Sequence, residues 1–410
     1  MKTIAFASLL IATAIVPAQA QSSPQAGGRY QAVLGDCEGC HTAVGGKPFA
    51  GGTVLQTPFG KIAVPNITSD HDTGIGSWTE ADFRRALREG ESPGGERLYP
   101  AMPYPAYAQM SDADVASLWA YMKTVAPVHN AVEPNLLPFP FNIRTLMAGW
   151  NWLYFKPAPF APTAGKSADW NRGAYLVNGP GHCGACHAPK TLLGADRSAA
   201  LTGASLQGWF APEITGAKPR GIGNWSAGGI ATYLKTGWSS HSVATGPMAE
   251  VVERSTSQMT DGDLNAIAVY LKDQPAGADM QPASASLRSD PAMQAGGRLY
   301  RDNCATCHGA DGKGERLIFP PLAGNAILVQ SSAESLTRVV LAGAQAAGTK
   351  AAPTAPSMPS YAWKFNDAQV ANLLTYIRNN WGNAAQAVSA ESVGKIRAGL
   401  SGGPSLANKE

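Results

Sequence analysis

The sequence predicts an all-α fold made of three small helical modules in tandem. The pattern C-x-x-C-H occurs three times and uses all six cysteines of the 410-residue chain. Each copy follows a segment with a glycine and a tyrosine, and precedes a polar helix-start signal with a tyrosine ten residues beyond it. Two stretches rich in proline, alanine and other small residues separate the three units.

The three motifs point to one kind of chemistry. The cysteine pairs and the histidines that follow them are Cys37, Cys40 and His41; Cys183, Cys186 and His187; and Cys304, Cys307 and His308. Two thiols on one helical turn can add to the two vinyl groups of a haem, while the adjoining imidazole reaches the iron from the same side. Zinc or a redox dithiol is the alternative, but zinc prefers four protein ligands and each copy offers at most three. The sequence therefore predicts three covalent haems c per chain.

The composition agrees with small modules built around a large apolar cofactor. Charged residues make up 15% of the chain, and it contains 45 Gly and 30 Pro. The formal net charge is only +3, so the sequence suggests no nucleic-acid partner.

Residues 1–20 have the pattern of a secretory signal peptide. Lys2 precedes an apolar run from Ile4 to Val16, and the stretch closes with Pro17-Ala18-Gln19-Ala20, a small-residue cleavage pattern. The run is shorter than the roughly 20 residues that a membrane helix needs. We therefore expect an exported, periplasmic chain, in a compartment where thioether bonds to haem protect the cysteines from oxidation.

The first module is expected to span residues 26–127. Gly28-Arg29-Tyr30 opens a short helix that leads into the first cysteine motif. A later helix follows Ser111-Asp112-Ala113-Asp114, whose serine and third-position acid form a capping signal. Tyr121 lies ten residues beyond this cap. A glycine on the first helix and an aromatic residue on the last, at a fixed register, predict that the two helices cross closely.

The second module, residues 166–273, and the third, residues 292–382, repeat this plan. The corresponding segments are Gly173-Ala174-Tyr175, Thr260-Asp261-Gly262-Asp263 and Tyr270 in the second, and Gly297-Arg298-Leu299-Tyr300, Asn366-Asp367-Ala368-Gln369 and Tyr376 in the third. The first two modules also share an Ile-Thr pair followed by Gly-Ile-Gly-x-Trp, which indicates a duplication. The third lacks that segment and is a more distant relative.

A low-spin electron-transfer haem needs a second axial ligand, and methionine opposite histidine raises the potential. Methionines recur at matching distances after the motif histidines: Met102 lies 61 residues after His41, Met248 lies 61 after His187, and Met358 lies 50 after His308 in the shorter third module. We therefore expect Met102, Met248 and Met358 to be the distal ligands, opposite His41, His187 and His308.

Met110 and Met259 are rival candidates, because each lies directly before the last helix of its module. Phe365 fills that place in the third module and cannot ligate iron, so we interpret the position as a hydrophobic staple. The remaining histidines, whose spacing does not recur, are expected to be solvated loop residues: His71, His129, His182 and His241.

Three segments lie outside the modules. The first linker, between residues 127 and 166, is rich in proline and aromatics, including Trp150, Trp152, Tyr154 and Phe155, and is either packing between modules or a surface for a partner or a bilayer. The second linker, about residues 273–291, is Ala, Ser and Pro and is expected to be mobile. A polar tail follows from 383 to 410, with a weakly helical piece over 390–400.

Four stretches carry a resemblance to a known family: Gly35-Asp36-Cys37 through Gly52, Asn66-Ile67-Thr68 with Gly74-Ile75-Gly76, Leu98 through Pro105, and Gly181 through His187. With them, nearly the whole mature chain resembles the cytochrome c subunits of membrane-bound periplasmic dehydrogenases that oxidise alcohols, gluconate, sorbitol or fructose. The resemblance implies three tandem class I cytochrome c domains, with haem cysteines, proximal histidines and distal methionines at the positions chosen above. Family members often add an amphipathic membrane-binding segment, which the polar tail does not match.

The resemblance also implies a role. Such a chain takes electrons from a separate dehydrogenase catalytic subunit of flavin, PQQ or molybdenum type, and passes them to ubiquinone or a terminal oxidase, with peripheral contact to the cytoplasmic membrane. We expect a non-catalytic electron-transfer subunit. Two alternatives stay open: a haem enzyme, such as a peroxidase or a thiol-oxidising cytochrome, or a cytochrome component of a terminal oxidase. The first needs an open iron site, and the second needs a membrane helix that the mature sequence lacks.

Overall fold

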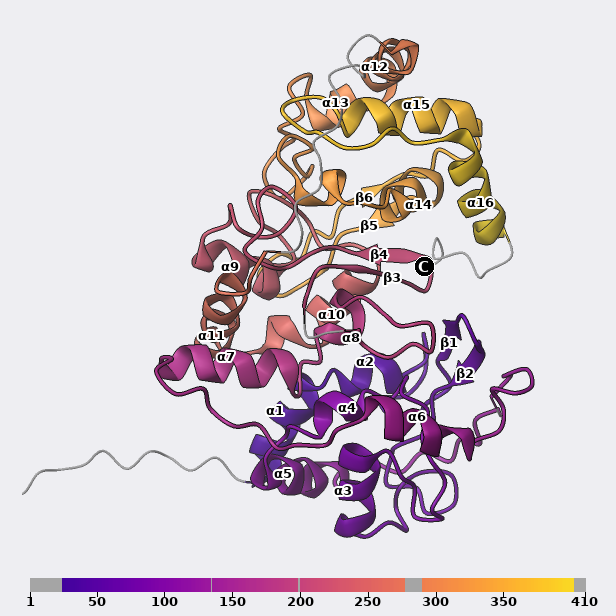
Figure 1. Cartoon of the computed structure of the whole chain (residues 1–410), viewed down its shortest axis with the longest axis vertical. Helices are drawn as coiled ribbons and strands as arrows, with labels where there is room; N and C mark the ends of the chain where they lie inside the picture. The colour runs from indigo at the N-terminus through magenta and orange to yellow at the C-terminus, as the bar shows by residue number, and fades with distance from the viewer. Residues whose placement is uncertain (1–23, 134, 198–199, 277–289, 402–410) are drawn as a thin grey trace, which may run out of the picture.

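The computed structural model describes residues 24–133, 135–197, 200–276 and 290–401. Within these ranges the chain is helical, with three short antiparallel two-stranded hairpins, which confirms the all-α class. Figure 1 shows the segments expected to form the three modules in a row, the first at the bottom, the second in the middle and the third at the top; we keep the word module for these segments. The expected signal peptide and most of the second linker lie outside the described residues.

Eight elements belong to the first module and the linker after it: α1 (Pro24–Leu34), α2 (Cys37–His41), β1 (Val54–Thr57), β2 (Gly60–Ala63), α3 (Glu80–Glu89), α4 (Tyr104–Tyr107), α5 (Asp112–Met122) and α6 (Leu146–Tyr154). α5 begins at the expected cap, since the Ser111 side chain accepts a hydrogen bond from the backbone N–H of Asp114. The core between α1, α3 and α5 contains Val115, Leu118 and Trp119, all buried.

The second module repeats the order of helices and adds one turn of 3-10 helix. Its elements are α7 (Ala168–Asn178), α8 (Gly184–His187), β3 (Ala204–Leu206), β4 (Trp209–Ala211), α9 (Ala227–Thr236), α10 (Pro247–Arg254), η1 (Thr256–Gln258) and α11 (Asp261–Lys272). The expected cap is present, because Thr260 accepts from the N–H of Asp263.

The third module consists of α12 (Pro291–Asn303), α13 (Ala305–His308), η3 (Ala326–Val329), α14 (Glu334–Ala342), β5 (Ala344–Gln345), β6 (Ser357–Met358), α15 (Asp367–Ile377) and α16 (Ala390–Ser401). α15 starts with a full capping box between Asn366 and Gln369. The helical piece of the tail, α16, packs onto α15, with Val393 fully buried in the core of this module. Its polar composition alone did not predict this contact.

The first and last helices of each module cross at a glycine, as the sequence pattern predicts. A Cβ on Gly28 would lie 1.9 Å from the backbone oxygen of Ser117 and 2.7 Å from Cβ of Tyr121. The same contact occurs at Gly173, where a Cβ would lie 2.0 Å from the oxygen of Ala266. In the third module the glycine is Gly296, one residue before the one that the pattern indicated; a Cβ there would lie 2.1 Å from the oxygen of Asn372. Only glycine allows so close an approach of the two backbones.

None of the helices in the described ranges is both long and apolar enough to cross a lipid bilayer.

Candidate functional site

The three cysteine motifs form the same local structure. Each occupies a one-turn helix, α2, α8 or α13, that directly follows the first helix of its module and ends at the motif histidine. All six thiols are free, and each is at least partly accessible. Burial raises the pKa of Cys37, Cys40 and Cys183 to about 12 and that of Cys304 to about 11. Such thiols stay protonated at neutral pH, which is the opposite of the low-pKa thiolate that a redox dithiol uses.

The motif histidines are held in one tautomer by a backbone carbonyl. His41 Nδ1 lies 2.8 Å from the carbonyl oxygen of Pro65, His187 Nδ1 lies 2.7 Å from that of Pro212, and His308 Nδ1 lies 3.0 Å from that of Pro320. Since a carbonyl oxygen can only accept, Nδ1 carries the proton and donates it, which leaves the lone pair on Nε2. Burial lowers the pKa of all three rings, so they are neutral and able to act as metal ligands.

The sequence analysis missed the three prolines that supply these carbonyls. A signal was present, because Pro65 and Pro212 each lie two residues before the Ile of the Ile-Thr pair that the first two modules share. Pro320 lies in the segment that replaces it in the third module. The contact uses a backbone oxygen, however, and no side-chain pattern indicates where a carbonyl points.

The three methionines expected as distal ligands are only half-buried, while the rival positions are buried. Met110, Met259 and Phe365 have exposed fractions of 1%, 3% and 4% and lie inside the cores of their modules. Met102 packs on the same core as Cys37, and Met358 packs on the same core as Cys304. In the first and third modules, the motif and the methionine therefore pack against one common core.

The second module differs in this respect. Met248, at the start of α10, packs with Ala249, Val252 and Ala347 of the third module, in a cluster separate from the core that Cys183 contacts. Tyr233 of α9 touches both clusters and connects them.

The first cysteine motif contacts the second module directly. Arg254, at the end of α10, forms an ion pair of 3.3 Å with Glu38, which lies between Cys37 and Cys40. Burial, followed by the charges of Asp36 and Glu250, raises the pKa of Cys40, and Glu250 is also part of α10.

His182 is not the solvated loop residue that we expected. Its Nε2 lies 3.3 Å from the carbonyl oxygen of Gly35, and its ring packs edge-on against Tyr107 at 5.5 Å between centroids. The Tyr107 hydroxyl donates to the same oxygen at 2.9 Å. Burial at this junction lowers the pKa of His182. The sequence could not predict that His182 is covered, because the covering residues belong to the first module and lie more than 70 residues upstream.

The second and third modules are joined at their methionine segments. Thr245, three residues before Met248, forms an isolated antiparallel bridge with Ala346, and the N–H of Ala347 donates to Ala244 at 3.2 Å. In the third module β5 pairs with β6, which places Ala344 opposite Met358. One short strand therefore links the two methionine segments.

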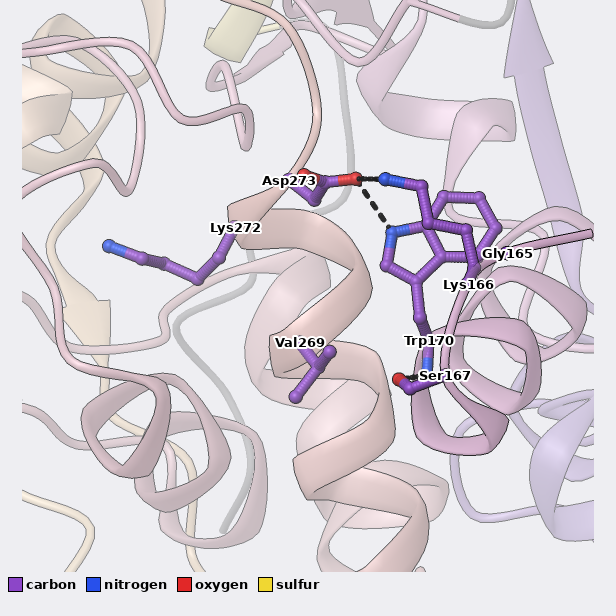
Figure 2. A pocket seen from close by; sticks show the side chains of 7 residues that line it. All are labelled: Gly165, Lys166, Ser167, Trp170, Val269, Lys272 and Asp273. Atoms are coloured by element: carbon purple, nitrogen blue, oxygen red, sulfur yellow. Dashed lines mark hydrogen bonds and ion pairs between the residues drawn. The ribbon is translucent and has the colours of Figure 1, made fainter. Parts of the chain in front are cut away.

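A shallow hollow lies away from the cysteine motifs, between α7 and the end of α11, and has a volume of about 340 Å³. Figure 2 shows Lys166 and the Trp170 indole both directed at Asp273, with distances of 2.6 Å and 2.8 Å to its Oδ2. These hydrogen bonds lower the pKa of Asp273. The two contacts to Asp273 fasten the end of the first linker to the last helix of the second module. No cysteine, histidine or methionine lines the hollow.

The donor set in each module fits a covalent haem. It consists of two neighbouring thiols, an imidazole whose free lone pair is on Nε2, and a half-buried thioether from a later segment of the same module. A small all-α unit with these groups is a c-type cytochrome.

Comparison with known proteins agrees with this class and identifies a family. A family model for cytochrome c matches residues 29–126 and 293–381. The cytochrome c subunit of gluconate 2-dehydrogenase from Pantoea cypripedii is 39% identical over 90% of this chain and 88% of its own length. The cytochrome c subunit of alcohol dehydrogenase (quinone) from Gluconobacter oxydans is 39% identical over 95% of this chain and 86% of its own. The fructose dehydrogenase cytochrome subunit of Gluconobacter japonicus is 38% identical, with 93% and 84% covered.

This chain belongs to the family of cytochrome c subunits of dehydrogenases. Membership implies covalently bound haem c and a role in electron transfer.

Proposed function

We propose that this chain carries three haems c and relays electrons from a periplasmic dehydrogenase to ubiquinone or a terminal oxidase. The observation that carries the proposal is the threefold repetition of one donor set, in which a motif histidine donates to a proline carbonyl in all three modules. The family model matches the first and third modules only. The middle module supports the third haem with the same helix crossing at Gly173 and the same contact from His187 to Pro212.

We assign the groups that hold each haem as follows. The covalent attachments are Cys37 and Cys40, Cys183 and Cys186, and Cys304 and Cys307; the proximal ligands are His41, His187 and His308; the distal ligands are Met102, Met248 and Met358. The proline carbonyls orient the imidazoles and keep the proton on Nδ1. When bound, haem c supplies one-electron exchange at iron. The matching domains are residues 26–127, 166–273 and 292–382, and α16 adds to the core of the third.

The contacts between modules favour a linear relay with the second module in the centre. Its α10 carries both Arg254, which pairs with Glu38 of the first motif, and Met248, whose segment bridges to the third module. These contacts hold the outer modules on opposite sides of the second, as Figure 1 shows. Electrons would therefore pass through the middle module on their way between the two outer ones.

The partners follow from the relatives. The gluconate, alcohol and fructose dehydrogenases named above each include a cytochrome subunit, and one of them is named for quinone. Oxidation of an alcohol or sugar removes two electrons, whereas a haem c exchanges one electron at a time. The donor therefore needs a cofactor, such as a flavin, a quinone or molybdenum, that takes up two electrons and releases them singly. We infer an exported catalytic subunit with such a cofactor as the donor, and no oxidation of organic substrates by this chain alone.

The haem count can be measured directly. Mass spectrometry of the denatured, reduced protein should show the mature chain plus three haems. Replacing Cys183 and Cys186 together by alanine should remove one haem and leave the other two. A wild-type mass with only two haems would exclude the assignment of the middle module.

The relay is tested by purifying the protein with and without the products of its neighbouring genes, among which we expect the catalytic subunit. Haem reduction by alcohols, aldehydes and sugar acids should occur only when the catalytic subunit is present. Rapid reduction of the isolated chain by one of these substrates would overturn the relay and favour a haem enzyme.

A further inference from the structure

An exposed apolar surface covers the segment between the first and second modules. Of the sixteen large apolar side chains exposed in the described part of the chain, eight fall between residues 136 and 154. They are Leu136, Phe139, Phe141, Ile143, Leu146, Trp152, Leu153 and Tyr154. We call this surface the linker face. Such a concentration exceeds the scattered apolar residues normal on a protein surface and marks a site of interaction.

The backbone beneath the linker face is held in place by the first module. Leu136 and Lys61 exchange two backbone hydrogen bonds, of 3.0 Å and 2.9 Å, which extend the β1–β2 hairpin. The ring of Phe141 packs on Phe59 with 5.0 Å between centroids. The exposed side chains are therefore presented by an anchored backbone.

Helix α6 is apolar on both of its sides. Trp150 points inward, is 7% exposed, and donates its indole N–H to the carbonyl oxygen of Leu193 at 2.9 Å. Trp152 and Leu153 are 83% and 53% exposed. Through the hydrogen bond of Trp150, α6 lies beside Leu192 and Leu193 of the second module, which are 94% and 45% exposed. A helix that is apolar all round needs a second apolar environment on its outer side.

The charged residues of this segment indicate what kind of environment the linker face contacts. Between residues 135 and 160 the chain has two basic residues, Arg144 and Lys156, and no acidic one. Arg144 is held by the first module, with Glu96 at 3.8 Å and a hydrogen bond of 3.1 Å to the carbonyl oxygen of Arg97, so the exposed Lys156 is the basic residue of this segment that is open to headgroups. Exposed Trp and Tyr beside basic residues are typical of a helix lying in the headgroup region of an anionic bilayer. A protein interface usually has a rim of hydrogen-bonding side chains, and the linker face offers few.

We propose that the linker face binds the surface of an anionic lipid bilayer, with α6 lying parallel to it and Phe139, Trp152 and Leu153 inserted among the headgroups. This proposal extends the relay proposed above. The biological role of the membrane binding rests on that relay, because a quinone acceptor dissolves in the bilayer. Lipid binding itself requires no electron transfer.

Vesicle flotation of the full-length holoprotein tests the proposal. The protein should float with vesicles of equal parts phosphatidylglycerol and phosphatidylethanolamine, and much less with phosphatidylcholine alone. The double variant F139S/W152S should partition at least about tenfold more weakly, because two large side chains no longer leave water. The matched control is Trp363→Ser in the third module, where the tryptophan is 81% exposed, and it should float like the wild type.

Three outcomes would overturn the proposal: no flotation of the wild type with anionic vesicles, undiminished flotation of the double variant, or an equal loss in Trp363→Ser. Loss of co-purification with the catalytic subunit in F139S/W152S, with flotation intact, would instead assign the linker face to that subunit. Electron transfer to a water-soluble acceptor, measured in parallel, should be unchanged in the double variant. Failure of the relay and failure of membrane binding are thereby told apart.

Discussion

Tyr30 of the first module and Tyr175 of the second make the same contact in opposite directions. The Tyr30 hydroxyl donates to Asp263 at 2.7 Å, at the start of the last helix of the second module. The Tyr175 hydroxyl donates to Asp114, at the start of the last helix of the first. Both tyrosines stand two residues after the glycine where the helices cross. A contact that is repeated with the partners exchanged relates the two modules by an approximate two-fold axis.

Replacing either tyrosine by phenylalanine should weaken this junction. Each change deletes one hydrogen bond to a carboxylate and should lower the free energy of unfolding by about 1.5–3 kcal/mol. Guanidinium denaturation of the holoprotein measures the loss. Tyr154→Phe, on the exposed side of α6, is the control and should change stability by less than about 0.5 kcal/mol. Equal losses in all three variants would show that the reciprocal contact contributes nothing specific.

The same junction should be sensitive to acid. Burial tends to raise the pKa of Asp263, but hydrogen bonds from Arg172, at 2.8 Å, and from Tyr30 outweigh it, and the net pKa is lowered. A carboxyl whose folded pKa is depressed contributes stability above its unfolded pKa, about 3.9, and loses it as the pH falls through the folded value. Stability should therefore drop below about pH 4. Urea midpoints measured against pH should fall less steeply in Asp263→Asn, which is less stable at neutral pH; parallel curves would contradict this assignment.

The helix crossing offers a test with neighbouring residues. Gly28→Ala places a methyl group 1.9 Å from the backbone oxygen of Ser117, so α1 and α5 must separate. The change should cost at least the 1–3 kcal/mol or so that is typical of overpacking. Gly27→Ala meets no atom within 4 Å and should stabilise the helix by about 0.5–1 kcal/mol. Thermal unfolding of both variants decides the point, and a similar loss in Gly27→Ala would contradict the close crossing at Gly28.

The two methionines of the first module should behave differently when replaced by alanine. Met102→Ala should open one iron site, so that the reduced protein binds carbon monoxide there, and should lower that potential by on the order of 0.1 V, within the roughly 0.8 V range that axial ligands cover. Met110→Ala should leave the iron closed but cost about 2–5 kcal/mol of stability, because it empties a buried position. Redox titration and carbon monoxide spectra distinguish the two. The reverse result would move the distal ligand to Met110.

Local features were predictable because few neighbouring residues create them. The caps at Ser111, Thr260 and Asn366 form as expected, since the side chain and the N–H that it accepts from are three residues apart. The helix crossing was predictable from a repeated register, but the third module uses Gly296 where the pattern indicated Gly297. Helix packing decides which of two adjacent glycines faces the partner.

By itself the sequence determined the all-α class, the three repeated motifs and the membership of the chain in a cytochrome family, because motif spacing and helix caps depend on residues close in the chain. Only the tertiary structure decided that proline carbonyls orient the motif histidines, that α16 buries Val393 against α15, and that His182 lies under the first module. Each of these depends on a backbone oxygen or a surface brought from a distant part of the chain. Such partners are chosen by packing, which the spacing of residue types does not record.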